Sequence, residues 1–123
     1  MRVRFTRIVD TPDGGSRFED GSQELSPADF APPAPPLGVS TVAGARSVQF
    51  IGGPPGWDSP PHPTPARQWL VVVAGAVLAT TSDEVERVFG PGDVVLLEDV
   101  AGVGHRARVV SEVPWLAFVT QLA

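Results

Sequence analysis

The sequence predicts an all-β fold, a sandwich or barrel of short strands, and three observations lead to this expectation. Apolar residues alternate with polar ones or run without interruption over short segments, which is the pattern of strands. Turn residues separate these segments at regular spacing, and no segment sustains a helical period over about ten residues. With 123 residues, 42% of them apolar, the chain suffices for one domain with its own core.

The N-terminal third is expected to mix short strands with turns and one long loop. Residues 3–9 alternate like a half-exposed strand near a sheet edge, residues 10–15 contain a Pro-Asp-Gly-Gly turn, and residues 17–20 suit a brief strand. Between residues 26 and 38 there are prolines at positions 27, 32, 33, 35 and 36. Proline disfavours helices and central strands, so we expect an extended loop there.

The rest of the chain is expected to be nearly continuous β-structure. Residues 39–51 are strand-like, and residues 52–65 form a loop rich in proline and glycine. Further strands are expected over residues 68–74, 76–81, 85–89, 94–98, 105–112 and 115–121. Alternation places Gln68 on the same face as aliphatic residues of its strand. It also groups His105 with Ala107 and Val109 on an inward face, with two arginines outside.

The composition excludes several classes of function. The chain has no cysteine, lysine or tyrosine, so it offers no disulfide, thiolate ligand, lysine Schiff base or phenolic acid. Its net charge is −5 and its nine basic residues are scattered arginines, which argues against a nucleic-acid partner. No apolar run is long enough for a membrane span, and residues 1–9 lack the continuous apolar centre of a signal peptide. We therefore expect no membrane partner and a cytoplasmic location.

The only two histidines lie in two glycine-anchored motifs. The first reads Gly56-x5-His62-x-Thr64-x3-Gln68-x6-Gly75, and the second runs from Pro91-Gly92-Asp93 to Gly102-x2-His105. This spacing resembles the cupin superfamily, whose motifs are written G-x5-H-x-H-x3-4-E-x6-G and G-x5-P-x-G-x2-H-x3-N. Thr64 and Gln68 stand where the family has its second histidine and its glutamate, and Val109 stands at the asparagine. The run from His62 to Gln68 also resembles small bacterial cupins that carry H-P-x-P-x-R-Q.

The resemblance implies one cupin domain over residues 1–123, folded as a jelly-roll β-barrel. Residues 1–38 would supply an N-terminal strand and the proline-rich loop, and residues 52–113 the core that bears the motifs. The superfamily habit also implies a homodimer, since exposed strand edges need covering; the first strand or the sheet bearing Trp69 would pack on its mate. Trp69 should face a second sheet or such a partner, and Trp115 should pack in the core.

We expect the candidate site inside the barrel, because convergent polar groups on an apolar wall are typical of small-molecule pockets. His62 and His105 are the candidate catalytic residues, since histidine alone titrates near neutrality when unperturbed. Gln68, Thr64, Gln49 and Trp57 are the candidate substrate-binding residues, and Ser59 is taken for an ordinary loop residue. The structural alternative is that His62 merely ends a loop and His105 merely caps a strand.

No metal or other cofactor is expected, although a divalent metal at low occupancy stays open. Metal-binding cupins offer three histidines and a glutamate, whereas this chain could offer His62, Gln68 and His105. Glu98 or Asp99 could add a carboxylate only if their loop folded inward, and a solvated turn is the expectation there.

The leading functional hypothesis is a small enzyme that carries out acid/base chemistry without a cofactor. Isomerisation, dehydration or cyclisation of a small, largely apolar organic metabolite would suit two imidazoles. The Gly, Pro, Ala and Val bias resembles a GC-rich bacterial genome, which makes specialised metabolism a plausible setting. Two alternatives stay open: a metal-dependent dioxygenase or isomerase, and a non-catalytic module that binds a small ligand.

Overall fold

The computed structural model describes residues 1–123 and consists of strands without any helix, which confirms the all-β prediction. The strands are β1 (Arg2–Asp10), β2 (Ser16–Glu24), β3 (Ser26–Ala28), β4 (Leu37–Val39), β5 (Ala45–Gly53), β6 (Gln68–Ala74), β7 (Val77–Thr80), β8 (Glu86–Phe89), β9 (Val94–Glu98), β10 (Arg106–Val109) and β11 (Trp115–Leu122). No segment therefore forms a helix able to cross a membrane.

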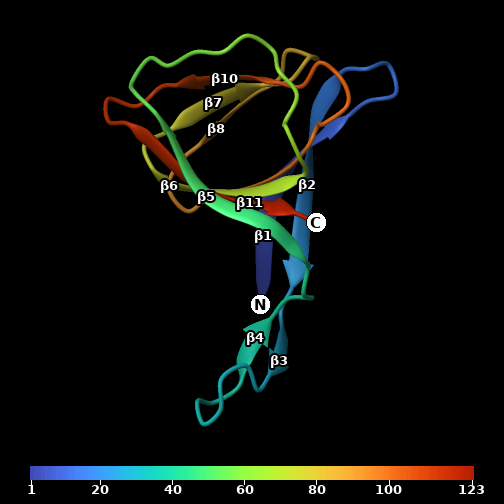
Figure 1. Cartoon of the computed structure of the whole chain (residues 1–123), viewed down its shortest axis with the longest axis vertical. Helices are drawn as coiled ribbons and strands as arrows, with labels where there is room; N and C mark the ends of the chain where they lie inside the picture. Colours follow the sequence, from blue (N-terminus) through green and yellow to red (C-terminus); the bar gives the residue numbers. More distant parts are fainter.

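Two sheets face one another and form a jelly-roll barrel, seen end-on in Figure 1. The larger sheet has the order β2-β1-β9-β6-β11-β5, and the smaller one has the order β10-β7-β8. Most neighbouring strands are antiparallel, but β1 and β9 are parallel. The first strand of the chain is thereby paired with β9, which lies within the second histidine motif.

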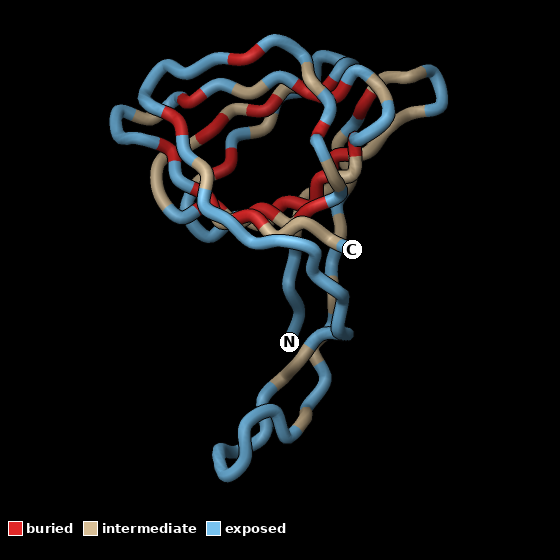
Figure 2. The backbone as a smooth tube through the Cα atoms, viewed as in Figure 1, coloured by how far each residue is buried: buried red, intermediate tan, exposed pale blue.

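The core lies between the two sheets, because each strand turns alternate side chains inward. Figure 2 shows the buried residues along the inner wall of the barrel and exposed residues outside. The buried cluster is aliphatic apart from two aromatic residues: Ile8, Leu70, Val72, Val77, Ala79, Phe89, Val95, Leu97, Val109, Trp115, Ala117 and Val119. On β6 the predicted alternation is confirmed: Gln68 and Leu70 are buried inside the barrel. Trp69 lies on the outer face, with its ring 4.8 Å from that of Phe5.

The proline-rich segment differs from the extended loop predicted for it. Strands β3 and β4 pair with each other over three residues each, and the connection between them carries four of the five prolines. Pro27 lies within β3, which is possible because a two-stranded ribbon has free edges where a missing amide hydrogen is tolerated. We call residues 26–39 the arm. In Figures 1 and 2 it projects away from the barrel and is exposed along its length.

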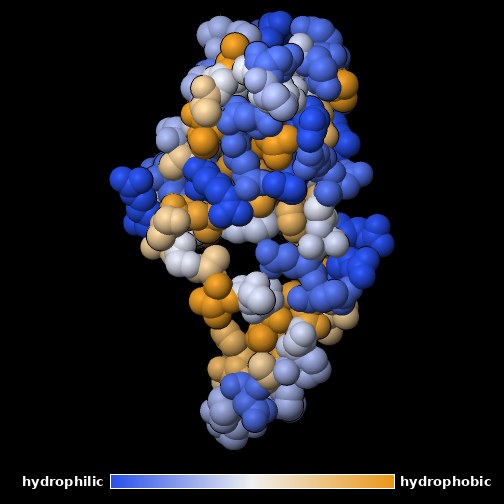
Figure 3. Space-filling model, turned by 90° about the vertical axis from the view of Figure 1, so that its right-hand side faces the viewer, coloured by the Kyte–Doolittle hydropathy of each residue, from blue (hydrophilic) through white to orange (hydrophobic).

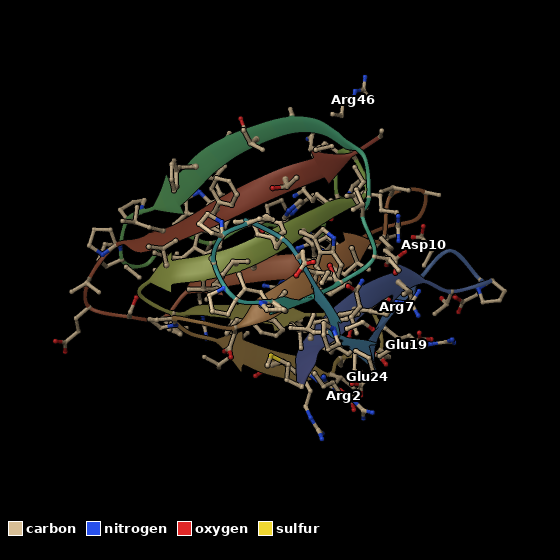
Figure 4. All side chains as sticks on the ribbon, turned by 90° about the horizontal axis from the view of Figure 1, so that it is seen from below. Arg2, Arg7, Asp10, Glu19, Glu24 and Arg46 are labelled. Carbon is tan, nitrogen blue, oxygen red and sulfur yellow. The ribbon has the colours of Figure 1, made fainter.

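Ion pairs link β1 to β2 and to β9. Arg2 pairs with Glu24 at 2.5 Å, and Arg7 bridges Glu19 at 3.0 Å and Glu98 at 2.7 Å. Figure 4 shows these arginines and Glu19 and Glu24 along the same side of the molecule, with Arg46 set apart at the start of β5. Glu98 also accepts a hydrogen bond from Arg67 at 2.7 Å. Burial opposes ionisation of Glu98, but the hydrogen bonds from Arg67 and Arg7 outweigh it and lower its pKa.

Candidate active site

A cavity of about 220 Å³ opens into the barrel interior, and both histidines line it. Its polar lining consists of His62, Thr64, Gln68 and His105 with Gln49 and Gln121. Its apolar lining includes Ile51, Leu70, Leu97, Val119 and Trp115, with Trp57 at 41% exposure. All six candidate site residues therefore lie on one cavity. A larger and more open hollow of about 450 Å³ on the outer surface lies between Arg4 and Arg87 and contains no imidazole.

The two histidines are paired through their backbones. The amide of His62 donates to the carbonyl of His105 at 3.1 Å, and the amide of His105 donates to the carbonyl of His62 at 3.1 Å. Their ring centroids lie 5.0 Å apart. Gly104 makes this approach possible: it has a φ of +74°, and a Cβ there would collide with the His62 carbonyl. One ligand can therefore touch both imidazoles.

A buried carboxylate supports His105 from behind. Asp99 has no exposed surface, and its Oδ2 lies 2.6 Å from Nδ1 of His105. The Thr64 hydroxyl donates to Oδ1 of the same carboxylate at 2.8 Å, and the Thr64 amide donates to the Asp99 carbonyl at 3.0 Å. The expectation of a solvated turn at Asp99 was wrong. The Thr64 hydroxyl is engaged with this carboxylate, so it orients Asp99.

The loop after Asp99 folds inward because the N-terminal hairpin holds it there. The Asp10 carboxylate accepts hydrogen bonds from the amides of Ala101 and Gly102, both at 3.0 Å. The Ser16 hydroxyl donates to the Gly104 carbonyl at 2.6 Å. These contacts join residues about 90 positions apart in the chain. They fix the loop at both sides of its turn and leave Asp99 no route to solvent.

The hydrogen-bond partners determine the tautomer of each imidazole. Nδ1 of His105 faces a carboxylate, and Nδ1 of His62 lies 3.0 Å from the carbonyl oxygen of Pro60. Both partners are acceptors, so each neutral ring carries its hydrogen on Nδ1 and has its free lone pair on Nε2. The cavity is therefore supplied with two nitrogen bases, of which only His105 has an anion to stabilise its protonated form.

The remaining polar side chains form a neutral wall. Gln68 is buried, and its Oε1 accepts a long hydrogen bond of 3.4 Å from Nε2 of Gln121. Gln49 lines the cavity from the outermost strand, where it pairs in register with Val119. No aspartate, glutamate or arginine lines the cavity, since Asp99 is covered by its two partners.

Sequence reasoning missed four members of the site. Besides Asp99, these are Gln121, Trp115 as a cavity wall, and Ser59, which is buried and accepts a hydrogen bond from the Ala107 amide at 3.1 Å. The Ser59 hydroxyl also lies 3.3 Å from Nδ1 of His62, so its reading as an ordinary loop residue was wrong. Alternation of β11 from Trp115 through Val119 to Gln121 is the one signal that could have indicated two of them.

The residues present do not fit a resident metal ion. No group of three or more His, Cys, Asp or Glu side chains converges anywhere in the structure. The nearest carboxylate, Asp99, has both oxygens engaged by Thr64 and His105. Two imidazoles and one amide oxygen are a weak donor set for a divalent cation.

These features define a small β-barrel protein with an uncharged-walled cavity that both histidines line. Comparison with solved structures identifies the fold as that of the cupin conserved barrel. The chain is similar to a cupin 2 conserved barrel domain protein from Salinispora arenicola, with a TM-score of 0.53 and 19% identity over 82% of this chain and 73% of that one. The sequence itself matches no protein-family model and no curated protein.

Two further solved structures are similar at lower TM-scores. One is a sugar phosphate isomerase of the cupin superfamily from Silicibacter pomeroyi, with a TM-score of 0.46 and 17% identity over 98% of this chain and 71% of that one. The other is FixK2 from Bradyrhizobium japonicum, with a TM-score of 0.42 and 20% identity over 62% of this chain and 40% of that one.

Proposed function

We propose that this protein is a small enzyme that catalyses proton transfer on a neutral, largely apolar organic molecule without a cofactor. The single observation that carries the proposal is the contact of 2.6 Å between the buried Asp99 carboxylate and Nδ1 of His105. A carboxylate in this position keeps the imidazole in one tautomer and stabilises the imidazolium that forms when Nε2 accepts a proton. A histidine that only packs in a core does not need a buried anion behind it.

In the proposed reaction, His105 is the general base and His62 is its partner acid. Nε2 of His105 takes a proton from the ligand, and His62 in its protonated form returns one to a different atom. Their ring spacing of 5.0 Å allows both to reach one small ligand. Moving a proton between two atoms is an isomerisation; when a leaving group or an internal nucleophile is present, it becomes a dehydration or a cyclisation.

The lining of the cavity supports a neutral substrate. Glutamine amides can donate to and accept from carbonyl or hydroxyl groups, but no cationic side chain is present to pair with a carboxylate or phosphate. The volume of about 220 Å³ lies below the range of drug-sized sites, so the ligand is small. Location in the cytoplasm and a role in bacterial specialised metabolism stay predictions.

A ring-opening probe tests the proposed base directly. A nitrobenzisoxazole is neutral and apolar; when a base removes its ring C–H proton, the N–O bond breaks and a coloured nitrile-phenolate forms. We expect the wild-type protein to accelerate this reaction with saturation kinetics, and His105→Gln to lower kcat by about 10²-fold. Gln121→Asn, which keeps the amide, is the matched control at the same cavity.

A ligand series tests the substrate class and separates catalysis from simple binding. We expect benzamide to protect the protein in thermal denaturation or to change the fluorescence of Trp57 and Trp115, and benzoate to do neither. Binding of benzamide without any acceleration of ring opening would favour the non-catalytic ligand-binding module. Preferential binding of benzoate would contradict the neutral-substrate proposal.

A further inference from the structure

The arm, residues 26–39, lies beside Met1 and Leu25 at its base, near Gly38, and is largely exposed beyond it. None of its 14 residues is buried and 11 are exposed; Phe30 and Leu37 have exposures of 71% and 52%. In the linker that follows, residues 40–44, the side chain of Val42 is 99% exposed. The arm carries one charged residue, Asp29, which forms no ion pair. An isolated two-stranded hairpin of this kind is marginal in water, so its apolar side chains need a surface to pack against.

Beside the arm, the outer face of the large sheet offers a matching hollow. This outer groove has a volume of about 340 Å³, and eight of its twelve lining residues are hydrophobic. Its hydrophobic lining includes Val3, Phe5, Leu25, Trp69, Val94 and Leu122. Figure 3 shows the surface hollowed between the arm and the barrel, with apolar side chains around the opening. The exposed Arg46 adjoins Ala45 of the groove and forms no ion pair, opposite in charge to Asp29.

We propose that two copies of this chain associate by exchanging arms, each arm lying in the outer groove of the other copy. The arm and the groove are complementary in polarity and charge, yet within one chain the arm points away from the barrel (Figure 1). A second copy offers a groove for the first copy's arm and an arm for the first copy's groove. A twofold axis between the copies then covers both arms and both grooves in a closed dimer.

The area available is sufficient for a stable dimer. A fully extended segment of 14 residues exposes roughly 2,000 Å², which is an upper bound for an arm that is paired as a hairpin. In the exchange each copy buries its own arm and its own groove, so about 400 Å² from each of the two surfaces reaches the roughly 800 Å² per partner of a standard interface. The cavity lies on the opposite face of β6, because Gln68 points inward and Trp69 outward. The proposed dimer therefore leaves the histidine site untouched.

Sedimentation velocity on the full chain tests the exchange. We expect twice the chain mass of 12.9 kDa at micromolar concentration. Leu37→Asp should raise the dimer dissociation constant at least tenfold, whereas Val103→Asp, at a nearly equal exposure of 53% but away from the arm, should leave it unchanged.

A second variant removes the arm without disturbing its base. Ser26 and Val39 are paired partners, so residues 27–38 can be replaced by an Asn-Gly turn that joins them. We expect a monomer that still binds benzamide as the wild type does. A wild-type monomer, or a dimer that survives both arm variants, would overturn the exchange. A monomer whose arm binds phosphatidylcholine vesicles would overturn it as well and assign the arm to a lipid surface.

Discussion

Asp99 and His105 lie six positions apart in the chain, and their side chains are joined by a 2.6 Å contact inside the barrel. The geometry depends on the turn between them, which Asp10 and Ser16 hold from the N-terminal hairpin. The carboxylate cannot reach solvent or a metal ion, and its remaining oxygen is occupied by Thr64. In the proposed function, the general base is therefore this one oriented imidazole, His105.

Asp99→Asn should lower the rate of nitrobenzisoxazole ring opening by about 10²-fold or more. An amide cannot stabilise the imidazolium, and it can turn its NH₂ group toward Nδ1, which reverses the tautomer and removes the lone pair from Nε2. The binding constant for benzamide should change by less than about twofold, because Asp99 does not line the cavity. Asp93→Asn, at an exposed turn, is the control. Equal losses of binding and turnover would indicate a structural role only.

The two histidines should be unequal on a probe that requires only a base. His105→Gln should reduce turnover by about 10²-fold, whereas His62→Gln should reduce it by less than about tenfold, since His62 faces a neutral carbonyl instead of a carboxylate. On a substrate that also needs an acid, both variants should lose about 10²-fold. Steady-state kinetics with both kinds of substrate measure this difference. Wild-type turnover in both variants would contradict acid/base catalysis.

Gly104→Ala should lower the free energy of unfolding by about 3 kcal/mol or more. The new methyl group would enter the His62 carbonyl, and the residue would retain a left-handed φ. Gly92→Ala is the matched control. Gly92 has a φ of +90° but open space around its Cβ position, so the substitution should cost only the backbone strain of about 1 kcal/mol. Urea unfolding monitored by tryptophan fluorescence gives both values, and equal losses would refute the steric argument.

Glu98 should make the stability depend on pH in the acidic range. Burial opposes its ionisation, yet hydrogen bonds from Arg67 and Arg7 hold its pKa below the ordinary 4.5. Its contribution is then fully present above about pH 4.5 and is lost as the pH falls through the lowered folded-state pKa. Glu98→Gln should be less stable by about 1 kcal/mol at pH 7 and indistinguishable in strong acid. A constant difference across urea titrations at several pH values would contradict this linkage.

No transition metal should copurify at stoichiometric amounts. The donor set is confined to His62, His105 and the amide of Gln68, and the missing carboxylate weakens it greatly. Elemental analysis of protein prepared without chelators measures the metal content. Added Ni²⁺ or Zn²⁺ should raise the melting temperature of the wild type and of His105→Gln by the same amount. Near-equimolar metal that is lost together with activity in His105→Gln would overturn this prediction.

The sequence predicts most of the barrel because its central strands carry strong local signals. The bounds of β6 and β9 agree with prediction, since their runs of Val and Leu are bounded by turn residues: Pro65 precedes β6, Gly75 follows it, and Gly92 precedes β9. The first strand of the N-terminal hairpin also lies close to its predicted bounds, whereas β2 is longer than predicted and the arm was predicted as a loop. The residues of β2 are mostly polar and those of the arm are rich in proline. The full length of β2 depends on its pairing with β1, which no local pattern indicates.

The sequence predicted the two histidines and Gln68 that line the cavity, but it missed the carboxylates that support them, Asp99 and Asp10. The spacing of His62, Gln68 and His105 follows local motifs, so it can be recognised along the chain. The burial of Asp99 requires the carboxylate of Asp10, which lies 91 or 92 positions from the amides that it binds. No local pattern carries that information.

The Thr64–Asp99–His105 arrangement also has a consequence for how such chains diverge. A threonine two positions after the first histidine and an aspartate six positions before the second place the buried carboxylate behind His105 and not on the cavity wall. Each replacement alone leaves a polar group buried without a partner, so the two are expected to be gained and lost together. Chains that carry this pair are expected to keep their carboxylate out of the cavity within the same barrel.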